Sequence, residues 1–359
     1  MAQIDQFLKV LVQQGGSDLH LTVGSPPVMR VHGYLQRIKF RELTNADLEA
    51  LVYEIMEEEW RISFVANQDY DFAYEVPGLA RFRANVFWQR KGLGCVLRTI
   101  PEKIMTADDL GLPTAVRRLC QLTKGLVLVT GPTGSGKSTT LAAMVDFINE
   151  SRTDHILTIE DPIEFVHPNK KSLVNQRELR TNTKSFTNAL RAALREDPDV
   201  ILVGEMRDRE TIELGITAAE TGHLVFGTLH TNSAPKTVDR IIDSFPADEQ
   251  EQIRSMLAES LKGVIAQVLL RAKDGKSRMA AMEIMVGTSA IGNLIRENKI
   301  HQIPSIIQTG KKDGMQLLDQ HILEFLMSGR ITAEEAYMKC NNKQAFLTHL
   351  EKPPQTEFS

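Results

Sequence analysis

Apolar and polar residues follow two different arrangements along the chain, and the change between them falls within residues 101–113. Before that segment, residues 4–13 and 44–56 place apolar side chains at helical spacing, and Thr44 or Asn45 can cap the second helix. Strand-like patterns occupy residues 17–31 and, with period-two alternation between turn residues, residues 70–100. These patterns predict a small α+β domain over residues 1–100 that contains an antiparallel meander.

Beyond residue 113 apolar runs alternate with helical patterns. The runs predict strands at residues 126–130, 155–159, 200–203, 224–228 and 279–286. Residues 246–270 show a long helical pattern, and further helices are expected over residues 288–345. Such alternation predicts an α/β domain with a mainly parallel sheet, whose ligands bind at the carboxyl ends of the strands.

The length of 359 residues favours two domains, since single domains usually have roughly 100–200 residues. Residues 101–113 contain Pro101, Gly111 and Pro113 without a sustained apolar period, so they are expected to link residues 1–100 to a second domain over residues 114–359.

Composition narrows the class of protein only slightly. A hydrophobic fraction of 42% and a net charge of −4 are typical of a globular protein and give no overall attraction to nucleic acid or anionic membrane. The cysteines, Cys95, Cys120 and Cys340, lack the spacing of a disulfide framework or a zinc site. Because no run of about 18 apolar residues occurs, the sequence predicts a cytosolic protein without a transmembrane segment.

The strongest motif follows the apolar run at residues 126–130. It is Gly131-Pro132-Thr133-Gly134-Ser135-Gly136-Lys137-Ser138, with the spacing G-x-x-x-x-G-K-S of a phosphate-binding loop, and Thr139 continues it. Backbone N–H groups of such a loop surround the phosphates at the start of a helix, here near Lys137. Lys137 is then expected to contact the β- and γ-phosphates and Ser138 to ligate Mg²⁺. The motif predicts binding of a nucleoside triphosphate.

Acidic residues and a histidine end three of the other predicted strands. Glu205, which follows residues 200–203 and Gly204, is the first candidate to position the attacking water, directly or through Mg²⁺; capping of the next helix is the alternative. Glu160 and Glu164 follow residues 155–159 and are candidates to hold metal-bound waters, beside the phosphate-binding loop if the two strands are neighbours. His230, at the end of another strand, is a candidate sensor of the γ-phosphate.

Four segments together resemble the secretion-type ATPases that drive type IV pili and type II secretion, over nearly the whole chain. They are GPTGSGKST at 131–139, ILTIEDPIEF at 156–165, DPDVILVGEMRD at 197–208 and GHLVFGTLHTN at 222–232. The last three are similar to the Asp box, the Walker B element and the His box of that family.

Within this family the chain is most similar to the ATPases that retract pili. It begins almost at once with the small domain, it has no tetracysteine insert, and residues 293–299 and 301–310 resemble C-terminal segments of those ATPases. One position differs, because the retraction ATPases commonly carry arginine where this chain has Gly292.

The resemblance implies a PAS-like N-terminal domain and a RecA-like ATPase domain with a helical C-terminal region. It also implies a homo-hexameric ring that hydrolyses ATP with Mg²⁺ in the cytoplasm, peripherally at the inner membrane, against a platform protein of the pilus machine (PilC-like). Arg81 and Arg83, two residues apart in a predicted strand, share one face. By themselves they are typical of a solvated strand face, but in the family arginines at matching positions contact the triphosphate.

Other functions are compatible with the same motifs. Pilus extension or type II secretion is the alternative within the family. A RecA-like nucleic-acid translocase shares the phosphate-binding loop, but no long basic patch with interleaved aromatic residues supports it, so no direct contact with nucleic acid is expected. A regulatory protein that binds nucleotide without turnover would leave the acidic residues at the strand ends unexplained.

Overall fold

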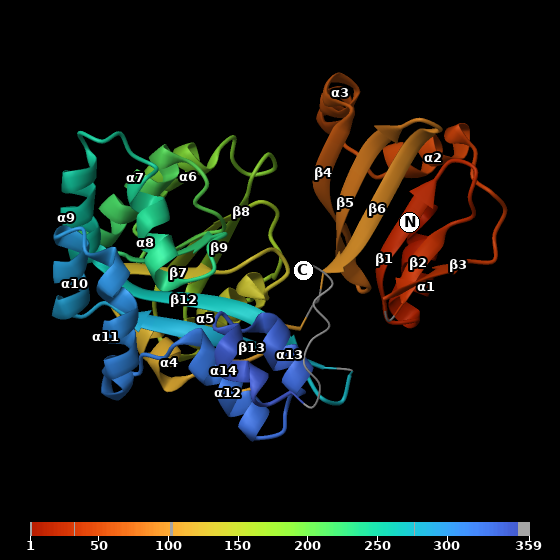
Figure 1. The fold of residues 1–359 in the computed structure, drawn as a ribbon. Coiled ribbons are helices and arrows are strands. Elements are labelled where there is room, and N and C mark those ends of the chain that lie inside the picture. The colour runs from red at the N-terminus through yellow and green to blue at the C-terminus, as the bar shows by residue number, and fades with distance from the viewer. Residues whose placement is uncertain (1, 32, 101–102, 276, 351–359) are drawn as a thin grey trace. The chain divides into compact units, whose positions relative to one another are not determined.

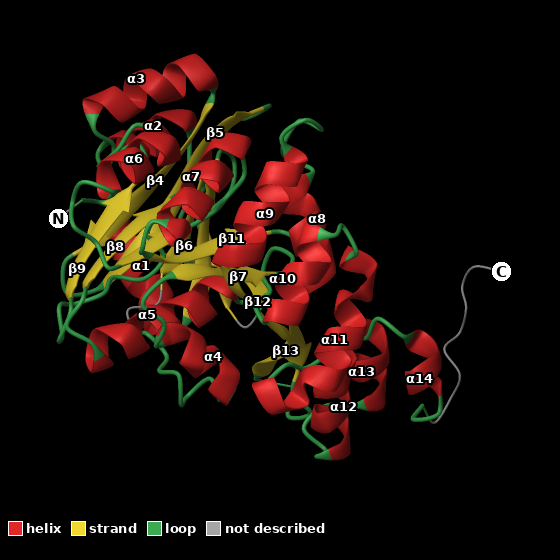
Figure 2. Cartoon of the chain, turned by 90° about the vertical axis from the view of Figure 1, so that its left-hand side faces the viewer, coloured by secondary structure: helices red, strands yellow, loops and turns green. Residues whose placement is uncertain are grey.

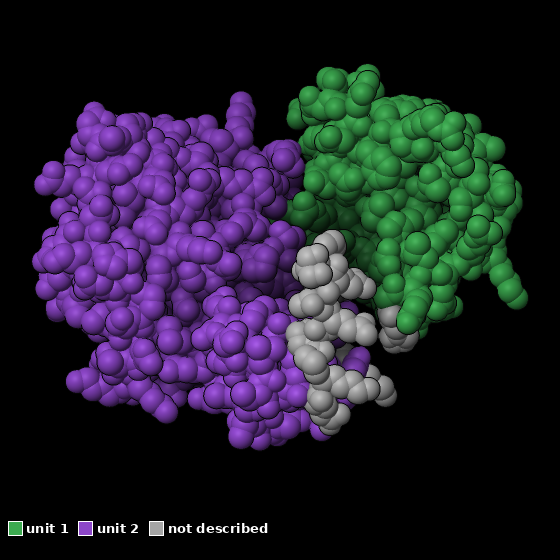
Figure 3. Space-filling view, viewed as in Figure 1, with its two compact units in different colours: residues 1–103, 162–166 green, residues 104–161, 167–359 purple. Residues whose placement is uncertain are grey.

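The computed structural model describes residues 2–31, 33–100, 103–275 and 277–350, and it divides into two compact units (Figure 1). Unit 1 comprises residues 1–103 and 162–166, and unit 2 comprises residues 104–161 and 167–359, as coloured in Figure 3. Residues 101 and 102 of the predicted linker lie outside the described residues. The grouping of residues 162–166 with unit 1 has no counterpart in the local sequence pattern.

Unit 1 is built around a six-stranded sheet in the order β3-β2-β1-β6-β5-β4, in which every neighbouring pair is antiparallel. The predicted helices and the meander over residues 70–100 are confirmed, while α3 and β3 were not predicted. Its elements are α1 (Ile4–Gln13), β1 (Gly16–Thr22), β2 (Val28–Val31), β3 (Tyr34–Arg37), α2 (Asn45–Tyr53), α3 (Glu58–Asn67), β4 (Asp69–Val76), β5 (Ala80–Gln89) and β6 (Gly92–Ile100).

The core of unit 1 follows directly from the sequence periods. On α1 the buried side chains include Ile4, Leu8 and Leu11, one face of a helix with 3.6 residues per turn. On β5 burial alternates, so Arg81 and Arg83 share the partly exposed face while the residues between and after them are buried. Arg83 forms an ion pair with Asp71 at 3.2 Å.

Unit 2 contains a seven-stranded sheet in the order β13-β12-β7-β11-β10-β8-β9. All neighbouring strands are parallel except β12 and β13. Its strands are β7 (Gly125–Thr130), β8 (His155–Glu160), β9 (Leu173–Glu178), β10 (Val200–Val203), β11 (Leu224–Leu229), β12 (Leu261–Arg271) and β13 (Arg278–Val286). Its helices are α4 (Thr114–Cys120), α5 (Lys137–Ser151), α6 (Phe186–Ala193), α7 (Arg209–Glu220), α8 (Ala234–Ile242), α9 (Gln250–Ser260), α10 (Ser289–Arg296), α11 (Ile303–Thr309), α12 (Leu318–Met327), α13 (Ala333–Lys339) and α14 (Lys343–Leu347), with 3₁₀ turns η1 (Ile300–Gln302) and η2 (Gly310–Asp313).

The long helix predicted over residues 246–270 is wrong. Helix α9 ends at Ser260, and the chain continues at once as β12, which is hydrogen-bonded between β7 and β13. An inner strand covered on both faces is apolar at nearly every position, so its sequence lacks the alternation that distinguishes a strand from a buried helix. Residues 261–270 are mostly apolar without strict alternation, and neither proline nor glycine stands directly at the boundary, since Gly263 follows only three residues after Ser260. The mainly parallel α/β sheet itself is confirmed.

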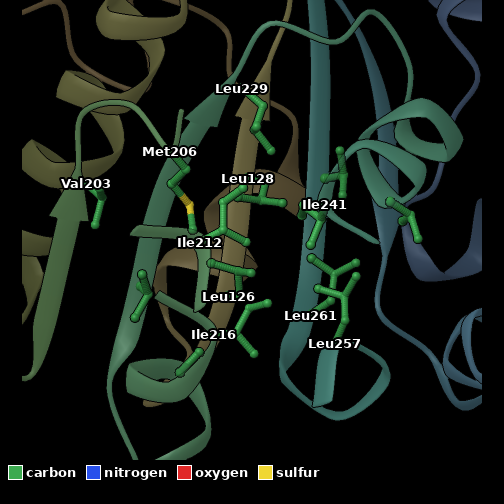
Figure 4. Packing of buried hydrophobic residues seen from close by; sticks show 14 of the residues in the cluster. Leu126, Leu128, Val203, Met206, Ile212, Ile216, Leu229, Ile241, Leu257 and Leu261 are labelled. Atoms are coloured by element: carbon green, nitrogen blue, oxygen red, sulfur yellow. The ribbon is translucent and has the colours of Figure 1, made fainter. Parts of the chain in front are cut away.

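Both faces of the unit 2 sheet are covered by helices (Figure 2). On β7, Leu126 and Leu128 belong to a cluster with residues of α6 to α10, whereas Val127 and Val129 pack with residues of α4 and α5. Figure 4 shows the first of these clusters, in which Met206 lies among aliphatic side chains of β7 and α7. Every residue of β7 is buried, so the loop that follows it starts from a fixed point in the core.

Gly292 lies on α10 where this helix packs against α9. A Cβ atom at this position would come within 3.0 Å of the carbonyl oxygen of Ala258. An arginine at this position would therefore require a small shift of one helix. Because Gly292 has no side chain, α9 and α10 approach each other more closely than a larger residue at this position would permit.

The three cysteines are free thiols buried in the two units. Burial raises the pKa of Cys95 and of Cys120 to about 12, which keeps both thiols protonated at neutral pH. In the part of the chain that the structure describes, no helix is both long enough and apolar enough to cross a bilayer.

His167 gives unit 2 a pH-dependent stability. Burial lowers its pKa to about 4, from about 6.5 in an unfolded chain. Between these values the unfolded chain binds a proton that the folded chain excludes, so the free energy of unfolding falls as the pH decreases through this window. We expect His167→Leu to reduce this loss between pH 7.5 and 4.5 by about 2–3 kcal/mol.

Urea unfolding followed by far-UV circular dichroism measures this effect. Tryptophan fluorescence is unsuitable, because Trp60 and Trp88 both belong to unit 1. The exposed residue His349 provides a matched control, His349→Leu, which should retain the wild-type pH dependence. Equal losses of stability in wild type and His167→Leu would show that His167 accepts a proton without unfolding.

Candidate nucleotide-binding and catalytic site

The phosphate-binding loop leaves β7 at Gly131 and enters α5 at Lys137, as the motif predicts. Gly131, Gly134 and Gly136 have φ angles of 144°, 77° and 87°, which favour glycine. At Gly131 a Cβ atom would lie 2.4 Å from the backbone oxygen of Gln267, so a side chain is excluded there by contact as well as by conformation. The glycines of the motif are thus explained by the fold alone.

Helix α5 directs its N-terminal backbone N–H groups into this loop. Gly136 is its N-cap, and no side chain in the described part of the chain caps that end. The N–H groups and the positive end of the helix dipole form a site for an anion such as phosphate. Lys137 adds a cation, and its Nζ donates hydrogen bonds to the carbonyl oxygens of Gly131 at 2.9 Å and Pro132 at 3.2 Å.

Glu205 stands at the centre of a charged group beyond β10. Its Oε2 lies 2.6 Å from Nη2 of Arg207, and its Oε1 lies 3.1 Å from Nε2 of His230, which follows β11. The two strands are parallel neighbours, and the backbone N–H of Met206 donates to the carbonyl of Thr228, so Glu205 and His230 are brought together by the sheet. The sequence placed both residues at strand ends but did not predict their contact.

The carboxylate of Glu205 is held in its charged form. Partial burial raises its pKa, but the hydrogen bond and charge of Arg207, with the charges of His230 and Lys137, outweigh burial and lower the pKa below its usual value. At neutral pH Glu205 is therefore an ionised acceptor, suited to orient a water molecule or to bind a divalent cation.

Glu160 lies elsewhere than expected. The idea that its strand neighbours that of the phosphate-binding loop is wrong, because β11 and β10 separate β8 from β7. Its strand instead adjoins β10, and the Cα of Glu160 lies close to Gly204, which precedes Glu205. The carboxylate accepts hydrogen bonds from Thr158 at 2.7 Å and Gln176 at 3.1 Å. Strand order depends on long-range pairing, which the local pattern does not encode.

The other predicted residues are distributed between the units. Arg81, Arg83 and the exposed Glu164 belong to unit 1, whereas the phosphate-binding loop, Glu205, Glu160 and His230 belong to unit 2. Within unit 2 the strands β7, β11 and β10 are parallel neighbours, so the loop, His230 and Glu205 all lie at the carboxyl ends of the strands.

A cavity of about 220 Å³ adjoins Glu205 and His230. Arg240 of α8 contributes to its lining, a role that the sequence did not predict because an arginine in the last turn of a helix is ordinarily explained by the helix dipole. The lining consists of Glu205, Met206, Arg207, Leu229, His230, Thr231 and Arg240.

The residues present are compatible with a magnesium nucleotide. Ser138 is the second residue of α5, and Glu205 is an ionised carboxylate, so both offer the hard oxygen ligands that Mg²⁺ prefers. The described residues include no cluster of three or more His, Cys, Asp and Glu side chains for a metal. Mg²⁺ bound to a nucleotide needs only one or two protein oxygens, with phosphate and water completing its shell.

Comparison with known proteins places this chain in a defined family. The family model described as Type II/IV secretion system protein matches residues 1–338, and the chain belongs to this family. It is an ATPase with a RecA-like nucleotide-binding domain and a smaller N-terminal α+β domain.

Two relatives and one solved structure are similar over most of their length. The type IV pilus retraction ATPase PilT of Pseudomonas aeruginosa is 55% identical over 96% of this chain and 99% of its own. A twitching motility protein of Neisseria gonorrhoeae is 54% identical over 89% of this chain and 85% of its own. The crystal structure of the pilus retraction motor PilT with bound ADP superimposes with a TM-score of 0.89 at 48% identity, covering 96% of this chain and 98% of that one.

Proposed function

We propose that this ATPase powers retraction of type IV pili and so supports twitching motility. The observation that carries the proposal is the placement of the phosphate-binding loop and the Glu205–His230 pair at the carboxyl ends of the neighbouring strands β7, β11 and β10, in a chain of which 96% aligns with PilT. Extension of the pilus or type II secretion is the alternative use of the same chemistry.

In this proposal each candidate residue has its own role in hydrolysis. Residues 131–139 hold the phosphates through backbone N–H groups, while Lys137 offsets the charge of the β- and γ-phosphates. Ser138 and Glu205 would hold Mg²⁺, which would supply charge stabilisation at the phosphates when bound. Glu205 orients the attacking water, and His230, 3.1 Å from it, reports the state of the γ-phosphate to that carboxylate. Glu160 and Glu164 are proposed to hold metal-bound waters.

The chain is further proposed to act as a homo-hexamer in the cytoplasm. There it would associate peripherally with a PilC-like platform protein of the inner membrane. The contacts of Arg81 and Arg83 with the nucleotide would then differ between ATP and ADP, because charge-assisted contacts are lost when the γ-phosphate leaves. Rotation of the domains would transmit this change around the ring.

Arg81→Ala tests the contribution of unit 1 to hydrolysis. We expect turnover to fall by roughly tenfold or more while nucleotide binding stays measurable, because a positive charge is removed from the transferring phosphoryl group. Phosphate release and binding of a fluorescent nucleotide measure the two properties. The exposed Arg90, at the end of the same hairpin, gives the control Arg90→Ala, and unchanged turnover in Arg81→Ala would remove Arg81 from the mechanism.

The proposed function itself is tested in a host strain that lacks this gene. Pilus shortening is measured by microscopy after complementation with wild type or with Lys137→Ala. Shortening restored by wild type alone supports an ATP-dependent retraction motor, whereas normal shortening without complementation would contradict it. ATP turnover strongly stimulated by single-stranded DNA would instead favour a nucleic-acid translocase.

A further inference from the structure

Gln267 of β12 reaches the phosphate-binding loop from a distant part of the chain. Its side-chain Nε2 donates a hydrogen bond of 2.7 Å to the carbonyl oxygen of Ser135, across 132 residues of sequence. The side chain is 1% exposed. Because a carbonyl oxygen only accepts, the Nε2 end of the amide must face Ser135, which fixes its orientation.

Two glycines of the loop pack directly against the same residue. A Cβ atom on Gly131 would lie 2.4 Å from the backbone oxygen of Gln267, and one on Gly136 would lie 3.2 Å from its Nε2. The pairing of β12 with β7, in which Ala266 lies opposite Thr130, keeps Gln267 at this height beside the loop. Gln267 therefore contacts the beginning, the middle and the end of the loop.

This hydrogen bond affects which backbone groups of the loop face a bound phosphate. The carbonyl of Ser135 is an acceptor, and an acceptor turned toward a phosphate would repel it, whereas the loop binds phosphate through its N–H groups. The hydrogen bond from Gln267 holds that carbonyl on the side of β12. A buried amide that also leaves its Oε1 without a hydrogen-bond partner among the described residues is costly to keep for packing alone.

We propose that Gln267 is a positioning residue for nucleotide binding, which orients the phosphate-binding loop through the carbonyl of Ser135. The inference rests on the nucleotide site of the proposed function. It assigns to β12 a role in nucleotide binding that requires no contact with the nucleotide, because the effect passes through the backbone of the loop.

The test is ADP binding by the full-length chain, measured by calorimetry, together with the urea midpoint of the nucleotide-free protein. Gln267→Met keeps the length and burial of the side chain but cannot donate a hydrogen bond. We expect the Kd for ADP to rise roughly tenfold, with less than a twofold change for ADP in the control Gln316→Met. Gln316 provides the same kind of contact elsewhere in unit 2, since its Nε2 donates to the carbonyl of Met282 at 2.9 Å.

The outcomes separate positioning from stability. A merely structural role would lower the urea midpoint of Gln267→Met and leave the Kd of the folded protein unchanged, which would overturn the inference. If Gln267→Met does not fold, Gln267→Asn replaces it: its amide is one methylene too short to reach Ser135, and a wild-type Kd would again overturn the inference. Failure of the wild-type chain to bind ADP would instead contradict the proposed function.

Discussion

Replacing Lys137 with alanine is expected to lower kcat/KM for ATP by about a thousandfold. Lys137 is the first residue of α5, and its Nζ lies 2.9 Å from the carbonyl oxygen of Gly131, so its ammonium group contacts the phosphate-binding loop. Its removal takes away the positive charge that is expected to contact the β- and γ-phosphates, and no other lysine in residues 131–139 replaces it. Phosphate release at saturating and subsaturating ATP measures the effect.

A suitable control is Lys124→Ala, which removes an exposed lysine just before β7 and should hydrolyse ATP at the wild-type rate. Substantial turnover by Lys137→Ala, with a normal unfolding transition, would show that the loop binds phosphate through its backbone alone.

Glu205→Gln is expected to lower kcat by roughly 10²–10⁴ while the Kd for nucleotide changes only a few-fold. The substitution keeps the shape of the side chain but removes the negative charge that Arg207 and His230 hold at 2.6 and 3.1 Å. A neutral amide neither attracts the proton of the attacking water nor balances the guanidinium charge of Arg207. Single-turnover hydrolysis and nucleotide binding separate the loss of chemistry from a loss of affinity.

The exposed Glu213 of α7 allows the same substitution without effect on the site, so Glu213→Gln is the matched control. The alternative that Glu205 caps the next helix is wrong, because Asp208 is the N-cap of α7 and its side chain accepts from the backbone N–H of Thr211. Wild-type turnover by Glu205→Gln would therefore remove Glu205 from the mechanism and make Glu160 the next candidate for the water-positioning group. The hydrogen bonds of Glu160 to Thr158 and Gln176 fix its carboxylate in unit 2.

Much of the sheet in unit 2 could be predicted from sequence because its inner strands are short apolar runs between turn signals. Strand β7 is buried at every position, and β10 and β11 are equally apolar, so each run is visible without knowledge of its neighbours. Strand β9 escaped prediction for the opposite reason. It lies at the edge of the sheet, and its partly exposed, mostly polar sequence resembles that of a loop.

The residues of the candidate site could also be predicted from sequence only in part. The phosphate-binding loop, Glu205 and His230 follow predicted strands directly, so their chemistry could be located from local sequence. Which strands are neighbours could not, and for that reason the contact of Glu205 with His230 and the distance of β8 from β7 were found only in the structure. Gln267 could not be identified from sequence either, because its pattern predicts a helix rather than a strand and its partner Ser135 lies 132 residues away.

The place of β12 in the sheet has a consequence for synthesis of the protein. The ribosome completes the phosphate-binding loop and strands β8 to β11 well before residues 261–271, yet β7 needs β12 as its second neighbour. Strands β7 and β12 are far apart in sequence, so they pair late in folding, since the loss of chain entropy on closing the intervening segment must first be overcome. A nascent chain thus carries the complete motif before β12 lies beside β7, and we expect its affinity for ATP to increase once the last inner strand of the sheet has left the ribosome.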